Sequence, residues 1–336
     1  MTRRSPTALS VFDRKLVVVT GKGGVGKSTI AAAIGLSAAA RGLRTIVVEL
    51  GDQSHLPALL DRARTLPGQV QARPGEEIEL AENLSGVTID QDRAMLEWLQ
   101  ALGGRVPGRV LAGSSSFQYF AAAAPGAREL VSLVKVWELT SAKRWRKRSR
   151  QYDLVVLDAP ATGHALGLLQ APQTFGAIAR VGPIFGQAEH VRKLLQDDTT
   201  TAYVAVALAT EMATGETIDL RDSLRSQLGV ELSWAIVNSV LPARRFSAAE
   251  IDRLGRIAIA SDGAADRDEA TRRAAVVAAT GVHARARAQQ KQIARLRRQG
   301  LPVLTVPFVF APELEPDDVL RIGRHLTGGG RAREGD

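Results

Sequence analysis

Short apolar runs recur along the chain and are separated by segments in which apolar residues have a helical spacing. The clearest runs lie at residues 16–20, 45–50, 152–158, 202–210, 233–239 and 302–306, with a shorter strand expected at 83–90. The first of these runs lack alternation of apolar and polar residues, which is typical of strands buried on both faces of a parallel sheet. Strands and helices in this order predict an α/β fold with a doubly wound, mainly parallel sheet, and a ligand at the carboxyl ends of its strands.

Helices are expected at residues 28–41, 187–196, 217–228, 247–299 and 317–326, and over most of 91–150. Within 125–140, Leu130, Val134 and Trp137 recur at i, i+4 and i+7, and Leu133 and Val136 add a second apolar side. Such a helix is either buried on two sides or lines a groove. Burial is the favoured interpretation, because exposed apolar grooves are rare on soluble proteins.

One domain accounts for the pattern. It covers residues 15–326 and carries a helical insert at about 91–150 and 172–198; flexible ends are expected at 1–14 and 327–336. A polar stretch at 61–82 and the residues 159–164 are predicted to be loops. A chain of 336 residues with 45% apolar content is long enough for one large domain of this kind. No internal repeat is visible, so half of a dimer is favoured over two fused copies.

The segment between the first strand and the first helix carries the strongest chemical signal. Gly21, Gly26, Lys27 and Ser28 satisfy G-x-x-x-x-G-K-[ST], a loop whose backbone amides surround a phosphate chain at a helix N-terminus. Lys27 supplies charge to the β- and γ-phosphates, and Ser28 offers a hydroxyl to Mg²⁺. The predicted nucleotide-binding set of this loop is Gly21, Lys22, Gly23, Gly24, Val25, Gly26, Lys27, Ser28 and Thr29.

Three glycines of this loop also fit G-x-G-x-x-G, the pattern of dinucleotide-binding folds, and acidic Glu49 follows one strand later. That pattern alone is weak. The pair Lys27-Ser28, the carboxylate of Asp158 at the end of another strand, and Lys22 inside the loop favour a P-loop instead. We therefore expect a nucleoside triphosphate with magnesium, and Asp158 as a partner of the metal together with Ser28.

Cysteine is absent, which excludes disulfides, thiolate metal sites and thiol redox chemistry. The net charge is +9, with basic clusters at residues 143–150 and 285–298. Both clusters are interpreted as solvated helix faces, because no nucleic-acid-binding motif accompanies them, and nucleic acid is not an expected partner. No apolar run approaches the roughly 18 residues of a transmembrane segment, and no signal peptide is recognisable, so a cytoplasmic chain is expected.

The loop GKGGVGKST resembles the deviant P-loop of the SIMIBI class of ATPases. In that class, the lysine that corresponds to Lys22 reaches the nucleotide of a partner subunit, so the resemblance implies a catalytic role for Lys22 beside Lys27. With LDAPATGHALGLLQAP at 157–172 and IVNSVLP at 236–242, the chain resembles the ArsA-like family of anion-pump and tail-anchored-protein-targeting ATPases. The resemblance is collinear over residues 15–326 and is closest to actinobacterial-type members.

The resemblance also implies how the base is bound. Asn238 matches the asparagine that recognises the edge of adenine, and Pro307 and Phe308 match the segment that closes over the base. ATP is therefore favoured over GTP. The family's partners are a second ATPase subunit and, in some members, a protein client.

Several family features are missing from this sequence. Without cysteine there is no arsenite site, no zinc clamp and no iron–sulfur cluster bridge. The chain has only three methionines, so the Met-rich groove that suits varied transmembrane clients is absent. Residues 327–336 do not form an amphipathic helix, which argues against a membrane anchor of the MinD type.

The first switch departs furthest from the family pattern. Members carry Asp-Pro-Ala-His after the second strand, whereas this chain has Asp52 and His55 at the same spacing but no proline. Asp52 is predicted to position the attacking water and to serve the metal, with Glu49 as its substitute. A third alternative is that neither carboxylate reaches the site, because orientation of water tolerates little misplacement.

Three functions follow as expectations. The first is a dimeric ATPase whose nucleotide cycle opens and closes the helical insert, which binds a client or a partner. The second is an ATP-binding subunit with weak or no hydrolysis of its own, paired with a paralogous ATPase. A DNA-riding ATPase is the third, and it rests only on the basic clusters.

Overall fold

An eight-stranded sheet forms the centre of the computed structural model, which describes residues 9–50, 56–60, 73–102, 126–145, 149–179, 182–242, 247, 249–250, 252–253, 256 and 267–328. Its strands are β1 (Leu16–Gly21), β2 (Thr45–Leu50), β3 (Ile78–Ala81), β4 (Leu84–Ile89), β5 (Leu154–Ala161), β6 (Thr201–Leu208), β7 (Trp234–Val240) and β8 (Val303–Pro307). The order is β3-β4-β2-β5-β1-β6-β7-β8. Only the β3–β4 pair is antiparallel within this sheet, so the predicted α/β class and mainly parallel sheet are confirmed.

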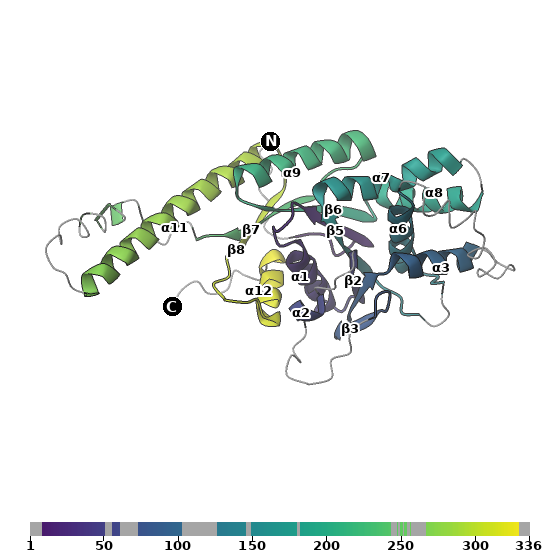
Figure 1. Cartoon of the computed structure of the whole chain (residues 1–336), viewed down its shortest axis with the longest axis horizontal. Coiled ribbons are helices and arrows are strands. Elements are labelled where there is room, and N and C mark those ends of the chain that lie inside the picture. The colour runs from purple at the N-terminus through teal and green to yellow at the C-terminus, as the bar shows by residue number, and fades with distance from the viewer. Residues whose placement is uncertain are drawn as a thin grey trace.

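Helices cover both faces of the sheet (Figure 1). They are α1 (Lys27–Ala39), α2 (Leu56–Leu60), α3 (Gln91–Leu102), α6 (Ala127–Thr140), α7 (Thr162–Ala179), α8 (Pro183–Gln196), α9 (Glu211–Ser223), α11 (Arg267–Arg298) and α12 (Pro316–Leu326), with a π-helical turn η1 (Leu224–Leu228) after α9. One hydrophobic cluster joins α1, α2 and α12 to the sheet, and a second joins α6, α7 and α8 to the other face.

The strands are continuously apolar because both of their faces are covered. In β1, Leu16 and Val18 belong to the cluster on the α7 side, whereas Val17 and Val19 belong to the cluster on the α1 side. All four side chains are fully buried. Alternate side chains of a strand point to opposite faces, so a strand between two helical layers needs an apolar residue at every position.

The helical insert lies at one end of the molecule and α11 extends from the other (Figure 1). In α6, Leu130 and Val134 are buried together with Leu133 and Val136, so the expected burial of this helix on two sides is confirmed. Trp137, on the same helix, stacks on His190 of α8 with ring centroids 5.3 Å apart. These contacts join the two segments of the predicted insert that are separated in the sequence.

A buried charge network fixes the C-terminal end of α6. Glu138, only 1% exposed, accepts hydrogen bonds from Lys135 at 3.1 Å, from Arg144 at 2.7 Å and from the backbone of Trp145 at 3.0 Å. Burial alone would raise the pKa of Glu138, but the hydrogen bond from Arg144 and the charges of Lys135 and Arg144 hold that pKa below its usual value. The network matters because a buried carboxylate is stable only when it is paired.

Four local predictions were wrong. Leu9 and Val11, assigned to a flexible N-terminal segment, are buried in the core. Strand β3 lies within the stretch that was predicted to be a loop at 61–82. Residues 159–164 are not a loop, because β5 continues to Ala161 and α7 begins at Thr162. Helix α9 begins at Glu211 rather than at 217, and its last turn widens into η1.

Helix α7 runs from the edge of the sheet into the insert, where it packs on α6 and α8. Pro172 lies inside this helix. No helix in the part of the chain that the structure describes has the length and apolar character needed to cross a membrane.

Candidate functional site

The P-loop lies where β1 passes into α1, at the carboxyl edge of the sheet. In the strand order, β5 is on one side of β1 and β6 is on the other. Val19 of β1 pairs with Asp158 of β5, which in turn pairs with Glu49 of β2. Three neighbouring strands therefore end together beside the N-terminus of α1, the position at which doubly wound folds bind ligands.

The glycines of the loop occupy conformations that other residues cannot adopt without strain. Gly21, Gly24 and Gly26 have φ values of 146°, 78° and 91°. A Cβ atom on Gly21 would lie 2.1 Å from the carbonyl oxygen of Val206, and one on Gly26 would lie 2.3 Å from Nδ2 of Asn238. Glycine at these positions lets the backbone fold close to β6 and β7 and leaves room for a phosphate chain.

Three polar groups meet around this loop. Lys27, the first residue of α1, donates from Nζ to the carbonyl oxygen of Lys22 at 3.2 Å. The Ser28 hydroxyl donates to Oδ2 of Asp158 at 2.5 Å. Gly26, the N-cap of α1, provides no side-chain acceptor for the first amides of the helix. Those amides and the helix dipole thus remain available to an anion.

Asn238 lies next to the loop at the end of β7. Its Nδ2 donates to the carbonyl oxygen of Val25 at 3.0 Å, and its Oδ1 accepts from the backbone amide of Ser239 at 2.9 Å. These contacts bring Asn238 to the nucleotide loop, and they also show a bracing role that the sequence did not indicate. Recognition of adenine by this side chain stays a prediction.

The predicted base-closing residues follow β8. Pro307, its last residue, pairs with Val240 of β7, two residues beyond Asn238. Phe308 donates its backbone amide to the Val240 carbonyl oxygen at 2.9 Å, and its ring meets Phe310 edge to face at 4.8 Å. Both rings are exposed, and closure of Pro307 and Phe308 over the base stays a prediction.

Lys22 points away from its own loop toward α9. Its Nζ lies 2.5 Å from Oε1 of Glu216 and 2.7 Å from Sδ of Met212. A cavity of about 290 Å³ lies beside it, lined by Lys22, Gly23, Ala161, Thr162, Gly163, Leu166, Glu216, Asp219, Leu220 and Ser223. Sequence reasoning missed Glu216 because no motif surrounds it; only the fold brings α9 to the P-loop.

Glu49 is buried at the end of β2, only 3% exposed. Its Oε1 accepts from the backbone amide of Leu56 at 3.2 Å, and its Oε2 accepts from the Thr88 hydroxyl at 3.3 Å. These bonds fix Glu49 between β4 and α2. Asp52 lies outside the described residues, so its assignment as the water-positioning carboxylate stays a prediction.

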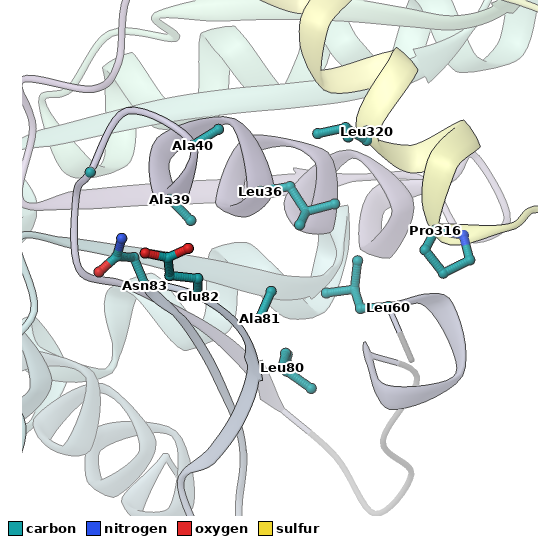
Figure 2. A pocket seen from close by; sticks show the side chains of 11 residues that line it. Leu36, Ala39, Ala40, Leu60, Leu80, Ala81, Glu82, Asn83, Pro316 and Leu320 are labelled. Atoms are coloured by element: carbon teal, nitrogen blue, oxygen red, sulfur yellow. The ribbon is translucent and has the colours of Figure 1, made fainter. Parts of the chain in front are cut away.

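A second cavity, of about 750 Å³, lies at the far end of α1 (Figure 2). Its lining comes from the end of α1 and the residues after it, from α2, from β3 and the turn that follows it, and from α12, namely Leu36, Ala39, Ala40, Gly42, Leu60, Leu80, Ala81, Glu82, Asn83, Pro316 and Leu320. Because α1 spans about 20 Å, this cavity is distant from the P-loop.

The loop fits a nucleotide with magnesium on the evidence of its own geometry. Its glycines pack against β6 and β7 where a Cβ would collide, Lys27 stands at the start of α1, and the Ser28 hydroxyl donates to the Asp158 carboxylate. Oxygen ligands of this kind suit Mg²⁺, which keeps several waters and binds phosphate oxygens as well. These features define a P-loop nucleotide-binding protein of the α/β class.

Comparison with known proteins gives the family. The family model described as anion-transporting ATPase, or ArsA ATPase, matches residues 14–184, which is just over half of the chain. The chain belongs to this family, and the resemblance inferred from its motifs is confirmed.

Several curated relatives carry ATPase names. ATPase BagA of Mycobacterium tuberculosis is 31% identical over 237 residues, which cover 68% of this chain and 66% of the relative. ATPase GET3C of Arabidopsis thaliana is 26% identical over 275 residues, covering 70% of this chain and 69% of the relative. The putative arsenical pump-driving ATPase of Halobacterium salinarum is 26% identical over 242 residues, which cover 69% of this chain and 36% of the relative. The match thus spans just under two thirds of the length of BagA.

Proposed function

We propose that the chain binds ATP with Mg²⁺ in its P-loop and hydrolyses it to ADP and phosphate, as one half of a dimer that closes with ATP and opens afterwards. The observation that carries the proposal is the meeting of Lys27, the Ser28 hydroxyl and the Asp158 carboxylate beside an uncapped helix N-terminus. The ATPase names of the relatives support the same activity.

Each residue of the site has its own role in the proposed reaction. ATP with Mg²⁺ supplies the phosphoanhydride bond that water breaks. The P-loop amides and Lys27 hold the phosphates, and their positive charge opposes the negative charge that develops there. Asp158 holds the Ser28 hydroxyl in place and offers a carboxylate to the metal and its waters. Asp52 orients the attacking water, and Asn238 with Phe308 binds the base.

Helix α7 links this chemistry to the helical insert. Its first residue, Thr162, lies four positions after Asp158, and its later turns pack on α6 and α8. A change in the backbone around residues 158–162 would therefore reach the first turns of α7, the helix that enters the insert. This continuity supports a nucleotide cycle that reshapes a client- or partner-binding surface.

One observation favours a second candidate, an ATP-binding subunit that hydrolyses poorly alone and pairs with a paralogous ATPase. Glu49, the substitute for Asp52, is buried and bonded to Leu56 and Thr88, so it is not free to orient water. If Asp52 does not reach the site either, hydrolysis needs a carboxylate from another chain.

The decisive experiment measures turnover in dimers of mixed variants. Lys22→Ala chains, which bind ATP but lack the trans lysine, are mixed with Lys27→Ala chains, which cannot hold ATP. The one filled site then faces an intact Lys22, and it should turn over roughly a hundred- to thousandfold faster than a site in a pure Lys22→Ala dimer, the usual effect of one transition-state charge donor. A mixed dimer that is no faster contradicts the trans role of Lys22. Wild-type chains that bind ATP without turnover favour the second candidate.

A further inference from the structure

The side chain of Lys22 is held by a helix of its own subunit. Oε1 of Glu216 lies 2.5 Å from the Lys22 ammonium, and Sδ of Met212 lies 2.7 Å from it. Met212 and Glu216 are four residues apart on α9 and therefore share one face of that helix. The carbonyl oxygen of Lys22, in contrast, accepts a hydrogen bond from Lys27 at 3.2 Å. The backbone of Lys22 thus contacts the P-loop, whereas its ammonium group contacts α9.

Helix α9, which carries Glu216, is held in place by an N-terminal cap and by a buried face. Thr210 caps its N-terminus by accepting from the amide of Ala213 at 3.3 Å. The opposite face of α9 is buried through Ala213, Thr214, Thr217 and Leu220. Glu216 therefore has a fixed position, whereas Lys22 extends from a glycine-rich loop.

The contact is nonetheless easy to break. The side chains of Lys22 and Glu216 are 37% and 36% exposed, and ion pairs with this much solvent access contribute little stability. A Cβ added to the neighbouring Gly23 would meet no atom within 4 Å, and the cavity of about 290 Å³ borders both charged residues. The Lys22 side chain has room to leave α9 without displacing packed atoms.

We propose that Glu216 is a positioning residue that keeps Lys22 in its own subunit and so sets the protein concentration at which ATP-bound chains close. This inference rests on the proposed dimeric function. An ammonium group has three donors, but Glu216 lies on the subunit of Lys22 and the phosphate that it would reach lies on the facing subunit, so in our proposal the Lys22 side chain leaves α9 when the dimer closes. Closing therefore exchanges a carboxylate partner for a phosphate partner, and Glu216 opposes it until the facing nucleotide supplies the stronger anion.

The contact itself is tested in the nucleotide-free chain. The sequence has only eight lysines, so the ammonium signals of a lysine-labelled sample can be assigned by substitution. The Lys22 signal should be protected from solvent exchange in the wild type and should lose that protection in Glu216→Gln. Asp219→Asn is the matched control, since Asp219 lines the same cavity one turn further along α9 but is not one of the two α9 residues, Met212 and Glu216, that contact the Lys22 ammonium. A Lys22 signal that is equally exposed in all three proteins overturns the proposal.

The effect on closing is measured by sedimentation with a non-hydrolysable ATP analogue and Mg²⁺. Glu216→Gln should lower the concentration of half-maximal dimerisation by roughly two- to fivefold, the range that a partly exposed ion pair supports. Asp219→Asn should not shift it. In a Lys22→Ala background, Glu216→Gln should have no further effect, because the side chain that it holds is gone.

The outcomes separate this inference from the proposed function. If the wild type dimerises and Glu216→Gln shifts the dimerisation concentration equally with Lys22 and with Ala at position 22, the proposed function stands and the role of Glu216 is overturned. If the wild-type chains form no dimer with the ATP analogue, the proposed dimer of like subunits is wrong. The solvent exchange of the Lys22 ammonium then decides alone whether Glu216 holds Lys22.

Discussion

The Ser28 hydroxyl donates to Oδ2 of Asp158 at 2.5 Å, so the first turn of α1 is tied to the end of β5. The two residues are 130 positions apart in the sequence and meet because β5 lies next to β1. A hydroxyl that donates to a carboxylate keeps its own oxygen lone pairs directed elsewhere, where a cation can use them. In the proposed function, a bound Mg²⁺ would use this hydroxyl oxygen and the carboxylate beside it.

Asp158→Asn should leave ATP affinity measured without Mg²⁺ nearly unchanged and should remove most of the gain that Mg²⁺ adds. The carboxylate serves the ion and its waters, whereas the P-loop amides serve the phosphates directly. Calorimetric titrations with and without Mg²⁺ measure both affinities. Equal losses in the two titrations would assign Asp158 a structural role instead.

Lys27→Ala should abolish detectable ATP binding. Its ammonium is the positive side chain at the start of α1, and it is the group that the P-loop pattern places on the β- and γ-phosphates. Lys193→Ala, on the exposed surface of α8, is the control and should bind ATP normally. Micromolar binding by Lys27→Ala in calorimetry would refute the P-loop assignment.

Asn238→Ala should weaken ATP binding and narrow the preference for ATP over GTP. The substitution removes the amide that is predicted to recognise adenine and the 3.0 Å bond to the Val25 carbonyl oxygen. Gly26→Ala should act in the same direction, because its Cβ would push the Asn238 side chain aside and strain a φ of 91°. An ATP-to-GTP ratio that is unchanged in Asn238→Ala would place adenine recognition elsewhere.

Asp52→Asn should reduce turnover by roughly a hundredfold or more, since the attacking water loses the carboxylate that orients it, and should leave ATP binding without Mg²⁺ unchanged. Glu49→Gln should instead lower the thermal unfolding midpoint, because Glu49 is buried and bonded to Leu56 and Thr88. Steady-state phosphate release and calorimetry distinguish the two variants. Full activity in Asp52→Asn would contradict its proposed role.

Arg144→Met should lower the free energy of unfolding by about 3 kcal/mol, the usual loss when one partner of a buried ion pair is removed. It leaves Glu138, 1% exposed, without its 2.7 Å partner. The pKa of Glu138 is lowered in the folded chain, so its stabilising contribution is present above about pH 4.3, the ordinary Glu value, and is lost as the pH falls below it.

The check is denaturant unfolding between about pH 3 and 7. Arg150→Gln, which breaks an exposed pair with Glu79, is the control and should not change the midpoint. Arg144→Met should unfold with a smaller loss of stability on acidification than the wild type. An identical pH dependence in the two proteins would show that the lowered pKa of Glu138 does not contribute to the stability difference.

Much of the fold was predictable because the strands are local and continuously apolar. The TIVVEL run at 45–50 and β2 have the same bounds, since a buried strand between two helical layers leaves few alternative conformations. Strand β3 was missed because it is an antiparallel strand of only four residues, IELA, which is partly buried and follows a polar stretch, so its apolar run is too short to stand out. Leu9 was missed because its burial depends on a distant contact: its amide donates to the Leu326 carbonyl oxygen at 2.7 Å.

The candidate site also has parts that the sequence predicts and parts that it does not. The P-loop is one contiguous segment, so residue type and spacing suffice to recognise its pattern, and Asp158 was proposed beside it because it ends a buried strand; the binding roles of these residues stay predictions. The partners that brace it could not be named from the sequence: Glu216 lies on α9 and the Asn238 amide bonds to Val25 across the sheet edge. Such contacts depend on strand order, which single-sequence patterns do not contain.

Pro172 gives α7 a mechanical property that matters for any motion of the insert. Proline has no amide hydrogen, so the Leu168 carbonyl oxygen one turn earlier receives no helical hydrogen bond, and a bend at this point breaks none. The turns before Pro172 can therefore tilt relative to the turns after it, in a helix that packs on α6 and α8. The insert is connected to the site through a joint, not through a stiff rod, and the angle of that joint is a quantity that binding at either end can change.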